Sequence, residues 1–143
     1  MEIKEAESDA DVARCLAAMS ELRTHFKEDS SNFVQRVQQQ RERGYHLVYL
    51  EDQGSIQAVA GYRIRDSLER ATPRDMYVAD LVSMPTARSK GYGYHIFSFL
   101  EETAKKAGCA RLLLESNIER ERAHKFYVNQ GLTKTAYRFA KDL

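Results

Sequence analysis

The segment from Tyr77 to Gly93 reads Y-V-A-D-L-V-S-M-P-T-A-R-S-K-G-Y-G and is the most informative part of the chain about its fold. Its first half is an apolar run typical of a β-strand, and its second half is a basic turn with two glycines that leads into a helical pattern. The first N–H groups of a helix have no intrahelical acceptor and lie at the positive end of the helix dipole, so they favour anions. The stretch therefore predicts a phosphate-binding turn between a strand and a helix.

Two common phosphate-binding motifs do not fit this turn. A P-loop requires Lys and then Ser or Thr after its second glycine, and the dinucleotide fingerprint requires a third small residue where Ile96 stands. A glycine-rich loop that only begins a helix is the plain alternative. The preceding strand, the break at Pro85 and the cations Arg88 and Lys90 favour the binding interpretation.

Length and composition indicate an ordinary folded protein. The chain has 143 residues, 43% of them hydrophobic and 30% charged, so we expect a single domain over residues 1–143. A formal net charge of +1 argues against a broad nucleic-acid surface. Two cysteines without zinc spacing indicate a reducing compartment, and no apolar run is long enough to cross a membrane. We therefore expect a cytoplasmic protein with no nucleic-acid or membrane partner.

Residues 1–44 predict a short strand and two helices. Ile3 lies in an extended segment, and Ser8 offers a capping side chain for a helix. That helix has an apolar stripe at three- and four-residue spacing: Val12, Cys15, Leu16, Met19 and Leu22. A second helix is expected from near Asn32 to Gly44, with Phe33, Val34 and Val37 on its buried side.

Residues 45–65 predict an antiparallel hairpin whose turn lies at 51–54. The two-residue period places one set of its second-arm residues on a single face: Ile56, Ala58, Ala60, Tyr62 and Ile64. A polar connection at 66–74 then leads into the strand at 76–84.

The turn at 88–93 is followed by a helix that ends at Gly108 and by an apolar segment at 110–116, typical of a strand covered on both faces. Strand, helix and strand make a βαβ unit with parallel pairing, which puts the turn at the carboxyl edge of a sheet. Asn117 can cap one more helix before Gly131, and residues 132–140 are strand-like.

This arrangement resembles the GNAT superfamily of N-acetyltransferases through two motifs. The segment 80–93, DLVSMPTARSKGYG, is similar to the family's central strand followed by its pyrophosphate loop, R-x-x-G-x-G. The segment 123–132, AHKFYVNQGL, is similar to the family's A-x-x-F-Y-x-x-x-G-F, with Leu132 in place of the usual aromatic residue. Together the motifs cover roughly residues 45–140. Residues 1–44, which usually shape the acceptor site in this family, match no motif.

The resemblance implies an α/β (α+β) fold: a mixed, mostly antiparallel central sheet with splayed parallel central strands, flanked by helices. It implies acetyl-CoA as co-substrate, with the pantetheine arm between the strands 76–84 and 110–116. Homodimers are common in the family, and the edge of the segment 132–140 is one physical route to pairing. The implied cofactor contacts are Leu81, Val82 and Ser83 through their main chain, the loop Arg88, Ser89, Lys90, Gly91, Tyr92 and Gly93, and the side chains of Asn117 and Tyr127.

Acetyl transfer to an amine needs a neutral nucleophile, a polarised thioester carbonyl and a proton for the leaving thiolate. The motif position of Tyr127 makes it the candidate acid, with a packed aromatic beside Phe126 as the alternative. Asp80 in the central strand is the candidate base, and its alternative is a carboxylate that pairs with an arginine or caps a strand bulge. The histidines and cysteines lack metal-ligand spacing, so we expect no metal.

We therefore expect an acetyl-CoA-dependent transferase that acts on the primary amine of a small molecule or a peptide. Four acidic residues in segments expected near the acceptor favour a cationic small molecule: Glu28, Asp29, Asp66 and Glu69. A catalytically silent acyl-CoA-binding sensor or regulatory module is the alternative. A protein that uses the same turn for ATP or NAD is a third interpretation.

Overall fold

The computed structural model describes residues 1–26 and 29–143. They form two compact units, residues 1–113 and residues 114–143, and each unit is described by itself. A single domain over residues 1–143 stays a prediction.

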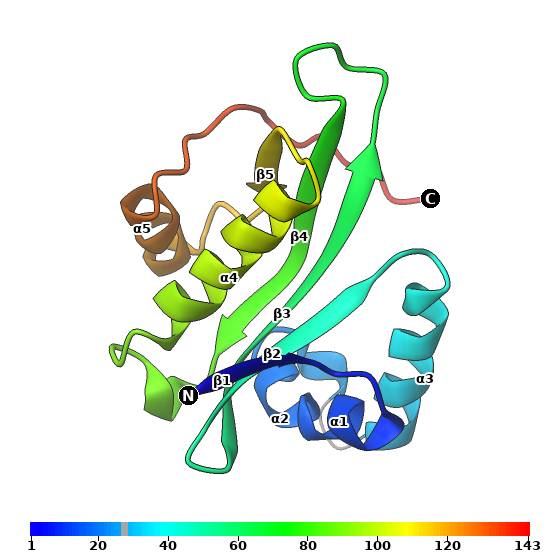
Figure 1. The fold of residues 1–143 in the computed structure, drawn as a ribbon, viewed down its shortest axis with the longest axis vertical. Helices are drawn as coiled ribbons and strands as arrows, with labels where there is room; N and C mark the ends of the chain where they lie inside the picture. The colour runs from blue at the N-terminus through cyan, green and yellow to red at the C-terminus, as the bar shows by residue number, and fades with distance from the viewer. Residues whose placement is uncertain (27–28) are drawn as a thin grey trace. The chain divides into compact units, whose positions relative to one another are not determined.

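The first unit is built on a five-stranded sheet with the order β1-β2-β3-β4-β5 (Figure 1). The pairs β1/β2, β2/β3 and β3/β4 are antiparallel, which confirms the expected mostly antiparallel sheet. The strands are β1 (Glu2–Glu5), β2 (His46–Asp52), β3 (Ser55–Asp66), β4 (Arg74–Ser83) and β5 (Arg111–Leu114), the last of which ends at the unit boundary.

β5 is shorter and more exposed than the sequence predicted. It ends at Leu114 instead of residue 116, and its residues are exposed or half-buried instead of covered on both faces. The N–H of Ala110 donates to the carbonyl of Arg74 at 2.8 Å, so β5 starts beside the start of β4. The two strands run in the same direction (Figure 1), as expected for strands joined by a helix.

Helices cover both faces of the sheet in the first unit (Figure 1). One face carries α1 (Asp9–Arg14), α2 (Leu16–Met19), η1 (Thr24–Phe26) and α3 (Ser30–Arg41). The other face carries α4 (Tyr92–Lys106), which packs on β2, β3 and β4 and is preceded by the short turn η2 (Pro85–Ala87).

Local capping explains where the first helices begin. The Ser8 side chain accepts a hydrogen bond from the N–H of Asp11 at 3.1 Å, which confirms the predicted cap. Asp29 caps α3 in the same way, accepting from the N–H of Asn32 at 3.0 Å, so α3 starts slightly earlier than predicted. The single helix expected on the first apolar stripe is divided at Cys15 into α1 and α2.

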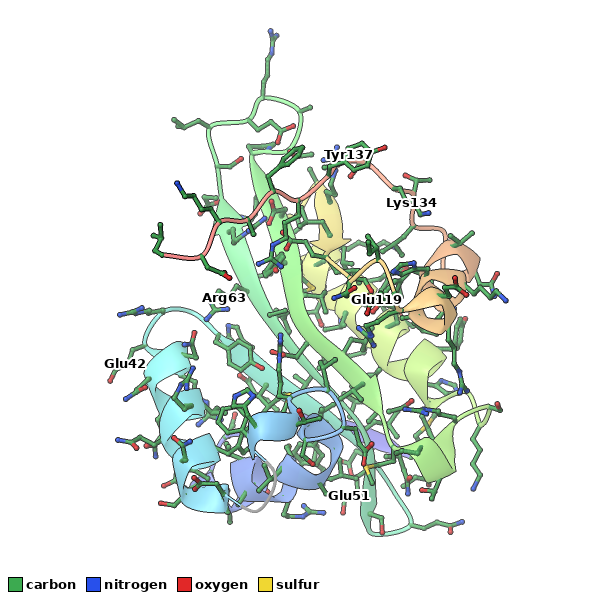
Figure 2. The ribbon with its side chains drawn as sticks, turned by 180° about the vertical axis from the view of Figure 1, so that it is seen from behind. Glu42, Glu51, Arg63, Glu119, Lys134 and Tyr137 are labelled. Carbon is green, nitrogen blue, oxygen red and sulfur yellow. The ribbon has the colours of Figure 1, made fainter. Side chains whose placement is uncertain are left out.

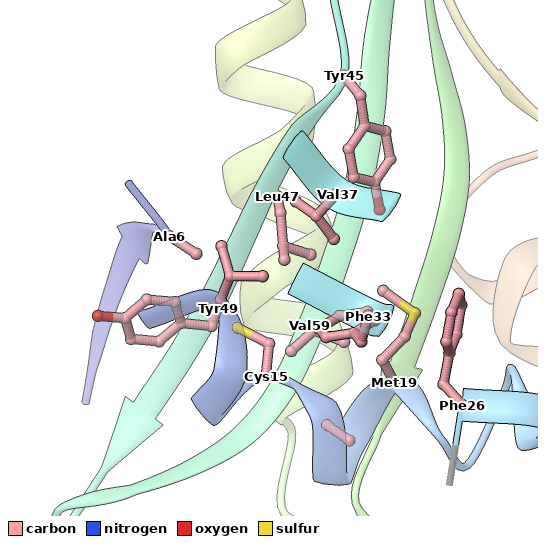
Figure 3. Packing of buried hydrophobic residues seen from close by; sticks show 12 residues of the cluster. Ala6, Cys15, Met19, Phe26, Phe33, Val37, Tyr45, Leu47, Tyr49 and Val59 are labelled. Carbon is pink, nitrogen blue, oxygen red and sulfur yellow. The ribbon is translucent and has the colours of Figure 1, made fainter. Parts of the chain in front are cut away.

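A core cluster lies between the sheet and α1, α2 and α3 (Figure 3). Leu47, Tyr49 and Val59 reach it from the strands, and Phe33 reaches it from α3. Side chains alternate along a strand, so Val48 and Leu50 of β2, which are also buried, point to the opposite face of the sheet. That face is covered by α4.

Two bulges change which side chains share a face. At each bulge one strand has an extra residue that has no partner on the neighbouring strand. The extra residue is Gln57 of β3 in its pairing with β2, and Ala79 of β4 in its pairing with β3. Ile56 therefore packs in the cluster of Val59, and the prediction that it shares a face with Ala58 was wrong. The bulge at Ala79 comes immediately before Asp80.

The second unit holds α5 (Glu121–Asn129) and the chain end. The strand-like interpretation of residues 132–140 was wrong, because this segment has no regular secondary structure. Tyr137 and Phe139 are 90% and 92% exposed, and none of the described strands pairs with the segment. A strand pattern without a partner backbone forms no ladder. The segment does hold one ion pair within the unit, Arg138 to Glu115 at 2.9 Å.

Candidate functional site

The turn that opens α4 has an unusual backbone. Ser89 and Gly91 have φ values of 69° and 82°, in the left-handed region, and such backbones gather N–H groups into anion-binding concavities. Gly91 is the N-cap of α4, and no side chain caps that helix. Arg88 and Lys90 are exposed beside it. The turn thus offers unsatisfied N–H groups and two cations at one place.

The first residue of α4 is tied to the last residue of β2, at the edge of the sheet where β4 also ends. The hydroxyl of Tyr92 donates to Oδ2 of Asp52 at 2.6 Å, and the amino group of Met1 lies 3.3 Å from Oδ1. The hydrogen bond from Tyr92 lowers the pKa of Asp52, and the same bond raises the pKa of Tyr92. Since the Tyr92 side chain is engaged in this way, its contribution to the turn is its backbone N–H.

The last residues of β4 extend beyond β5. Leu81, Val82 and Ser83 pair with β3 on one side. β4 has ten residues and β5 only four, and the two strands start side by side. The end of β4 therefore runs on past β5 toward the turn at 88–91.

Both oxygens of Asp80 accept hydrogen bonds from distant parts of the first unit. Nε of Arg23 donates to Oδ1 at 2.9 Å, and the hydroxyl of Tyr45 donates to Oδ2 at 2.8 Å. Nη2 of Arg23 also donates to the carbonyl of Ala79, the bulge residue, at 3.2 Å. These contacts are the ones expected if Asp80 has a structural role, as a strand carboxylate that pairs with an arginine beside a bulge. The role of Asp80 as base stays a prediction.

The ring of Tyr45 occupies the space next to Gly61, which has no side chain. A Cβ at Gly61 would lie 1.8 Å from the hydroxyl oxygen of Tyr45, so only glycine leaves room for the ring. Burial, and then the negative charge of Asp80, raise the pKa of Tyr45 well above its ordinary value. Tyr45 therefore remains a neutral donor to Asp80. The guanidinium of Arg63 lies over its ring, 5.2 Å from the centroid.

Asp80 and Tyr45 border a pocket of about 300 Å³ in the first unit. Side chains from α2, η1, α3, β3 and β4 line it, including the core residues Phe26 and Phe33, which Figure 3 labels. The other polar groups around it are cationic or neutral: Arg23, Arg36, Arg63, His25 and Gln40. Figure 2 labels Arg63 on β3.

Tyr127 lies half-buried on α5 in the second unit. Burial raises the pKa of its phenol above the ordinary value, while the charge and hydrogen bond of Arg120 lower it in part. Its ring meets that of Phe126 edge to face, with centroids 5.9 Å apart. The hydroxyl is thus hydrogen-bonded beside an aromatic neighbour, as the packing alternative expected, and its role as acid stays a prediction.

Asn117 does not cap α5, as the sequence had suggested. The N-cap is Arg120, and the Asn117 side chain instead accepts from the N–H of Glu119 at 3.0 Å. The carbonyl of Asn117 contacts Nε2 of His124 at 2.9 Å. Asn117 therefore shapes the turn before α5, because its short side chain bonds the backbone two residues on.

The acidic residues expected around the acceptor have other roles. Asp29 caps α3, Asp66 pairs with Nε of Arg74 at 2.8 Å, and Glu69 lies in an exposed loop. None of these three lines the described pocket, and Glu28 lies outside the described residues. These three residues therefore give no support to a cationic acceptor, which stays a prediction.

Within residues 1–26 and 29–143, no group of three or more His, Cys, Asp or Glu side chains is placed to hold a metal ion. Over the same residues, no helix has the length and apolar character needed to cross a membrane. Cys15 and Cys109 are both free thiols.

The sequence did not reveal the pocket arginines or Tyr45. Arg23 lies 57 positions from its partner Asp80, and such a pairing leaves no local pattern. One signal was available, since a glycine inside a strand often marks a close approach of another group, and Gly61 is such a glycine. That signal indicates a contact without naming the partner.

Comparison with known proteins agrees with this geometry. Residues 14–132 match the Acetyltransferase (GNAT) family. The uncharacterized N-acetyltransferase YhdJ of Bacillus subtilis is 33% identical over 144 residues, 99% of this chain and 98% of that protein. An aminoalkylphosphonate N-acetyltransferase of Salmonella typhimurium is 35% identical over 66 residues, 46% of this chain and 43% of that protein.

Among solved structures, a Trypanosoma brucei acetyltransferase superposes with a TM-score of 0.82 at 21% identity, covering 99% of both chains. That likeness shows the fold. The family match and the Bacillus relative show more: the chain belongs to the GNAT acetyltransferase family and is an N-acetyltransferase.

Proposed function

We propose that the protein transfers the acetyl group of acetyl-CoA to a primary amine, by direct attack of the amine on the thioester. The observation that carries the proposal is the start of α4, where a glycine N-cap and two exposed cations follow the end of β4. Such a start suits the pyrophosphate of coenzyme A, because the diphosphate supplies the acceptors that the helix lacks.

The cofactor-binding residues are those that the resemblance implies, and the turn at 88–93 and the end of β4 support part of the set. The N–H groups of Ser89, Gly91, Tyr92 and Gly93 would bind the pyrophosphate. Those of Arg88 and Lys90 donate within the turn at 3.4 Å, and the side chains of these two residues would serve as counter-ions. The main chain of Leu81, Val82 and Ser83 would pair with the pantetheine arm in the manner of an added strand, since this end of β4 extends beyond β5. Asn117 and Tyr127 complete the proposed set.

The chemistry moves two protons. Asp80 accepts a proton from the acceptor's ammonium, directly or through a water molecule, so that the neutral amine can form the new C–N bond. An N–H near Val82 and Ser83 polarises the thioester carbonyl. Tyr127 gives its proton to the sulfur as the C–S bond breaks. A carboxylate has four lone-pair positions, and two described hydrogen bonds leave Asp80 with capacity for this step.

An amine acceptor is also supported by a relative. The Salmonella protein is named for acetylation of aminoalkylphosphonates, and it shares 35% identity over its matched segment. A pocket of about 300 Å³ suits a small acceptor better than a folded protein surface.

The proposal is tested with acetyl-CoA labelled in its acetyl group and a panel of small amines and peptides with free amino groups. We expect label to move to at least one amine at a rate above hydrolysis. Binding of acetyl-CoA without transfer to any amine would contradict the enzymatic role and indicate the silent sensor instead. A failure to bind acetyl-CoA would contradict the proposal at its first step.

A further inference from the structure

The pocket beside Asp80 carries an excess of positive charge. Among the residues that the structure describes, three arginines and one carboxylate line it, and the carboxylate of Asp80 is already paired with Arg23. Among the described residues, no carboxylate pairs with Arg36 or Arg63: Arg36 lies over the ring of Phe26, and Arg63 donates to the amide oxygen of Gln40. A concave surface lined in this way attracts anions.

Arg63 is the best placed of these arginines. It is half-buried on β3, a rigid strand in the middle of the sheet, and Gln40 and the ring of Tyr45 fix its guanidinium. A guanidinium has five N–H donors in a planar fork that matches carboxylate and phosphate oxygens, and the bond to Gln40 occupies only one nitrogen. Partial burial strengthens any ion pair formed there.

Tyr45 also sets the spacing between the two charged groups. Its ring lies beneath Arg63, and its hydroxyl bonds Asp80, so a single tyrosine side chain spans the distance between them. A molecule that places its amine at Asp80 and reaches Arg63 with an anion needs only a short spacer. The pocket volume of about 300 Å³ is at the small end for ligand sites.

We infer that the acceptor is a small amine carrying an anionic group, a carboxylate or a phosphorus oxyanion, a few bonds from its amino group, and that Arg63 binds this anion. The inference rests on the proposed acetyl transfer and names its substrate class. It replaces the cationic acceptor that the sequence had favoured.

The test compares acceptors that share an amine and a three-atom spacer. The anionic acceptors are 2-aminoethylphosphonate and 3-aminopropanoate, and the matched ones are 3-aminopropan-1-ol and 1,3-diaminopropane. We expect kcat/KM for at least one anionic acceptor to exceed that of both matched amines by about tenfold or more, the effect of one charge-assisted hydrogen-bonded pair. The better of the two anions distinguishes carboxylate from phosphorus oxyanion chemistry.

Arg63→Gln should then raise KM for the anionic acceptor by about tenfold and raise KM for the neutral amine much less. Arg63→Lys should restore part of the preference. Arg43→Gln removes the same charge at an exposed position outside the pocket and should change nothing. The melting shift caused by acetyl-CoA should be the same in all three variants, which shows that the fold and the cofactor site are intact.

Transfer to the neutral or cationic amine at equal or higher kcat/KM would overturn the inference while leaving acetyl transfer standing. The inference would also be overturned if Arg63→Gln and Arg43→Gln reduced the preference for the anionic acceptor equally. If acetyl-CoA binds and no panel amine is acetylated, the acceptor class is wrong. If acetyl-CoA does not bind, the proposed function fails, and the inference fails with it.

Discussion

The hydroxyl of Tyr45 lies 2.8 Å from Oδ2 of Asp80 and joins the residue before β2 to the bulge of β4, 35 positions further along the chain. Tyr45 can reach Asp80 only because Gly61 has no side chain beneath its ring. The orientation of the candidate base is thus set by a tyrosine and a glycine on two other parts of the sheet.

This relationship predicts a strong coupling between positions 61 and 45. Gly61→Ala places a methyl group 1.8 Å from the Tyr45 oxygen, and we expect it to cost about 1–3 kcal/mol of unfolding free energy because the ring must move. In a Tyr45→Val background the ring is gone, so the same substitution should cost much less. Urea denaturation of the four proteins measures the coupling. Additive effects would show that Tyr45 does not lie over Gly61.

Asp80→Asn tests the candidate base. The amide has nearly the same shape, so the fold should persist while proton acceptance is lost. We expect kcat/KM to fall and the loss of rate toward low pH to flatten, because that limb reports protonation of the base in the free enzyme.

Asp75→Asn is the matched control for this experiment. Asp75 is also a buried carboxylate on β4, and it accepts from Nε of Arg65 at 2.9 Å. Its substitution should leave the pH profile unchanged. If both variants keep the wild-type profile, Asp80 has only a structural role.

Tyr127→Phe tests the candidate acid. We expect turnover to fall by about 10²-fold while acetyl-CoA still binds, since the phenol acts on the leaving thiolate only. Burial raises the pKa of Tyr127 above its ordinary value of 10.0, so the phenol stays protonated through pH 9. Turnover of the wild-type protein should therefore show no loss from this group between pH 7 and 9. Unchanged turnover in the variant would remove Tyr127 from the mechanism.

Cys15 predicts a pH dependence of stability. Burial raises the pKa of its thiol from an ordinary 9.0 to about 12, so above pH 9 the unfolded chain releases a proton that the folded chain keeps. Stability is complete below pH 9 and is lost as pH rises toward 12. Between pH 8 and 10 the loss is about 1 kcal/mol.

Urea denaturation at both pH values measures this loss. Cys15→Ala should reduce the difference between pH 8 and 10 by about 1 kcal/mol, whatever it costs at pH 8. Cys109 is only half-buried, so Cys109→Ala should retain most of it. Equal slopes in the wild-type protein and Cys15→Ala would contradict the assignment.

Local patterns in the sequence predicted the elements well. Ser8 marked the first helix cap, Gly91 marked the start of α4, and the hairpin around Gly54 appeared where turn residues separate two apolar runs. Each of these features depends on neighbours within a few residues. The strand, turn and helix at 77–93 were therefore placed correctly.

The errors arose where distant residues decide the outcome. A bulge at Gln57 moved Ile56 to the other face, and its position depends on the partner strand. The segment 132–140 has a strand composition but pairs with none of the described strands. Arg63 is a candidate anion-binding residue because it lies over the ring of Tyr45, and this contact joins residues that are distant in the sequence. The turn at 88–93 is local in sequence and could be predicted, whereas the pocket beside Asp80 is assembled from five elements and could not.

Binding of acetyl-CoA at the start of α4 is measured by a thermal-shift titration with acetyl-CoA and CoA against ATP and NAD. Gly91→Glu serves as the control, because it adds a side chain and a negative charge to the turn at a φ of 82°. At about 100 times Kd a bound ligand should add roughly 2.7 kcal/mol, which is a shift of several degrees for a domain of this size. We predict that only acetyl-CoA and CoA raise the midpoint and that Gly91→Glu abolishes the shift. An unchanged midpoint with both CoA species, or a larger shift with ATP or NAD, would contradict the account.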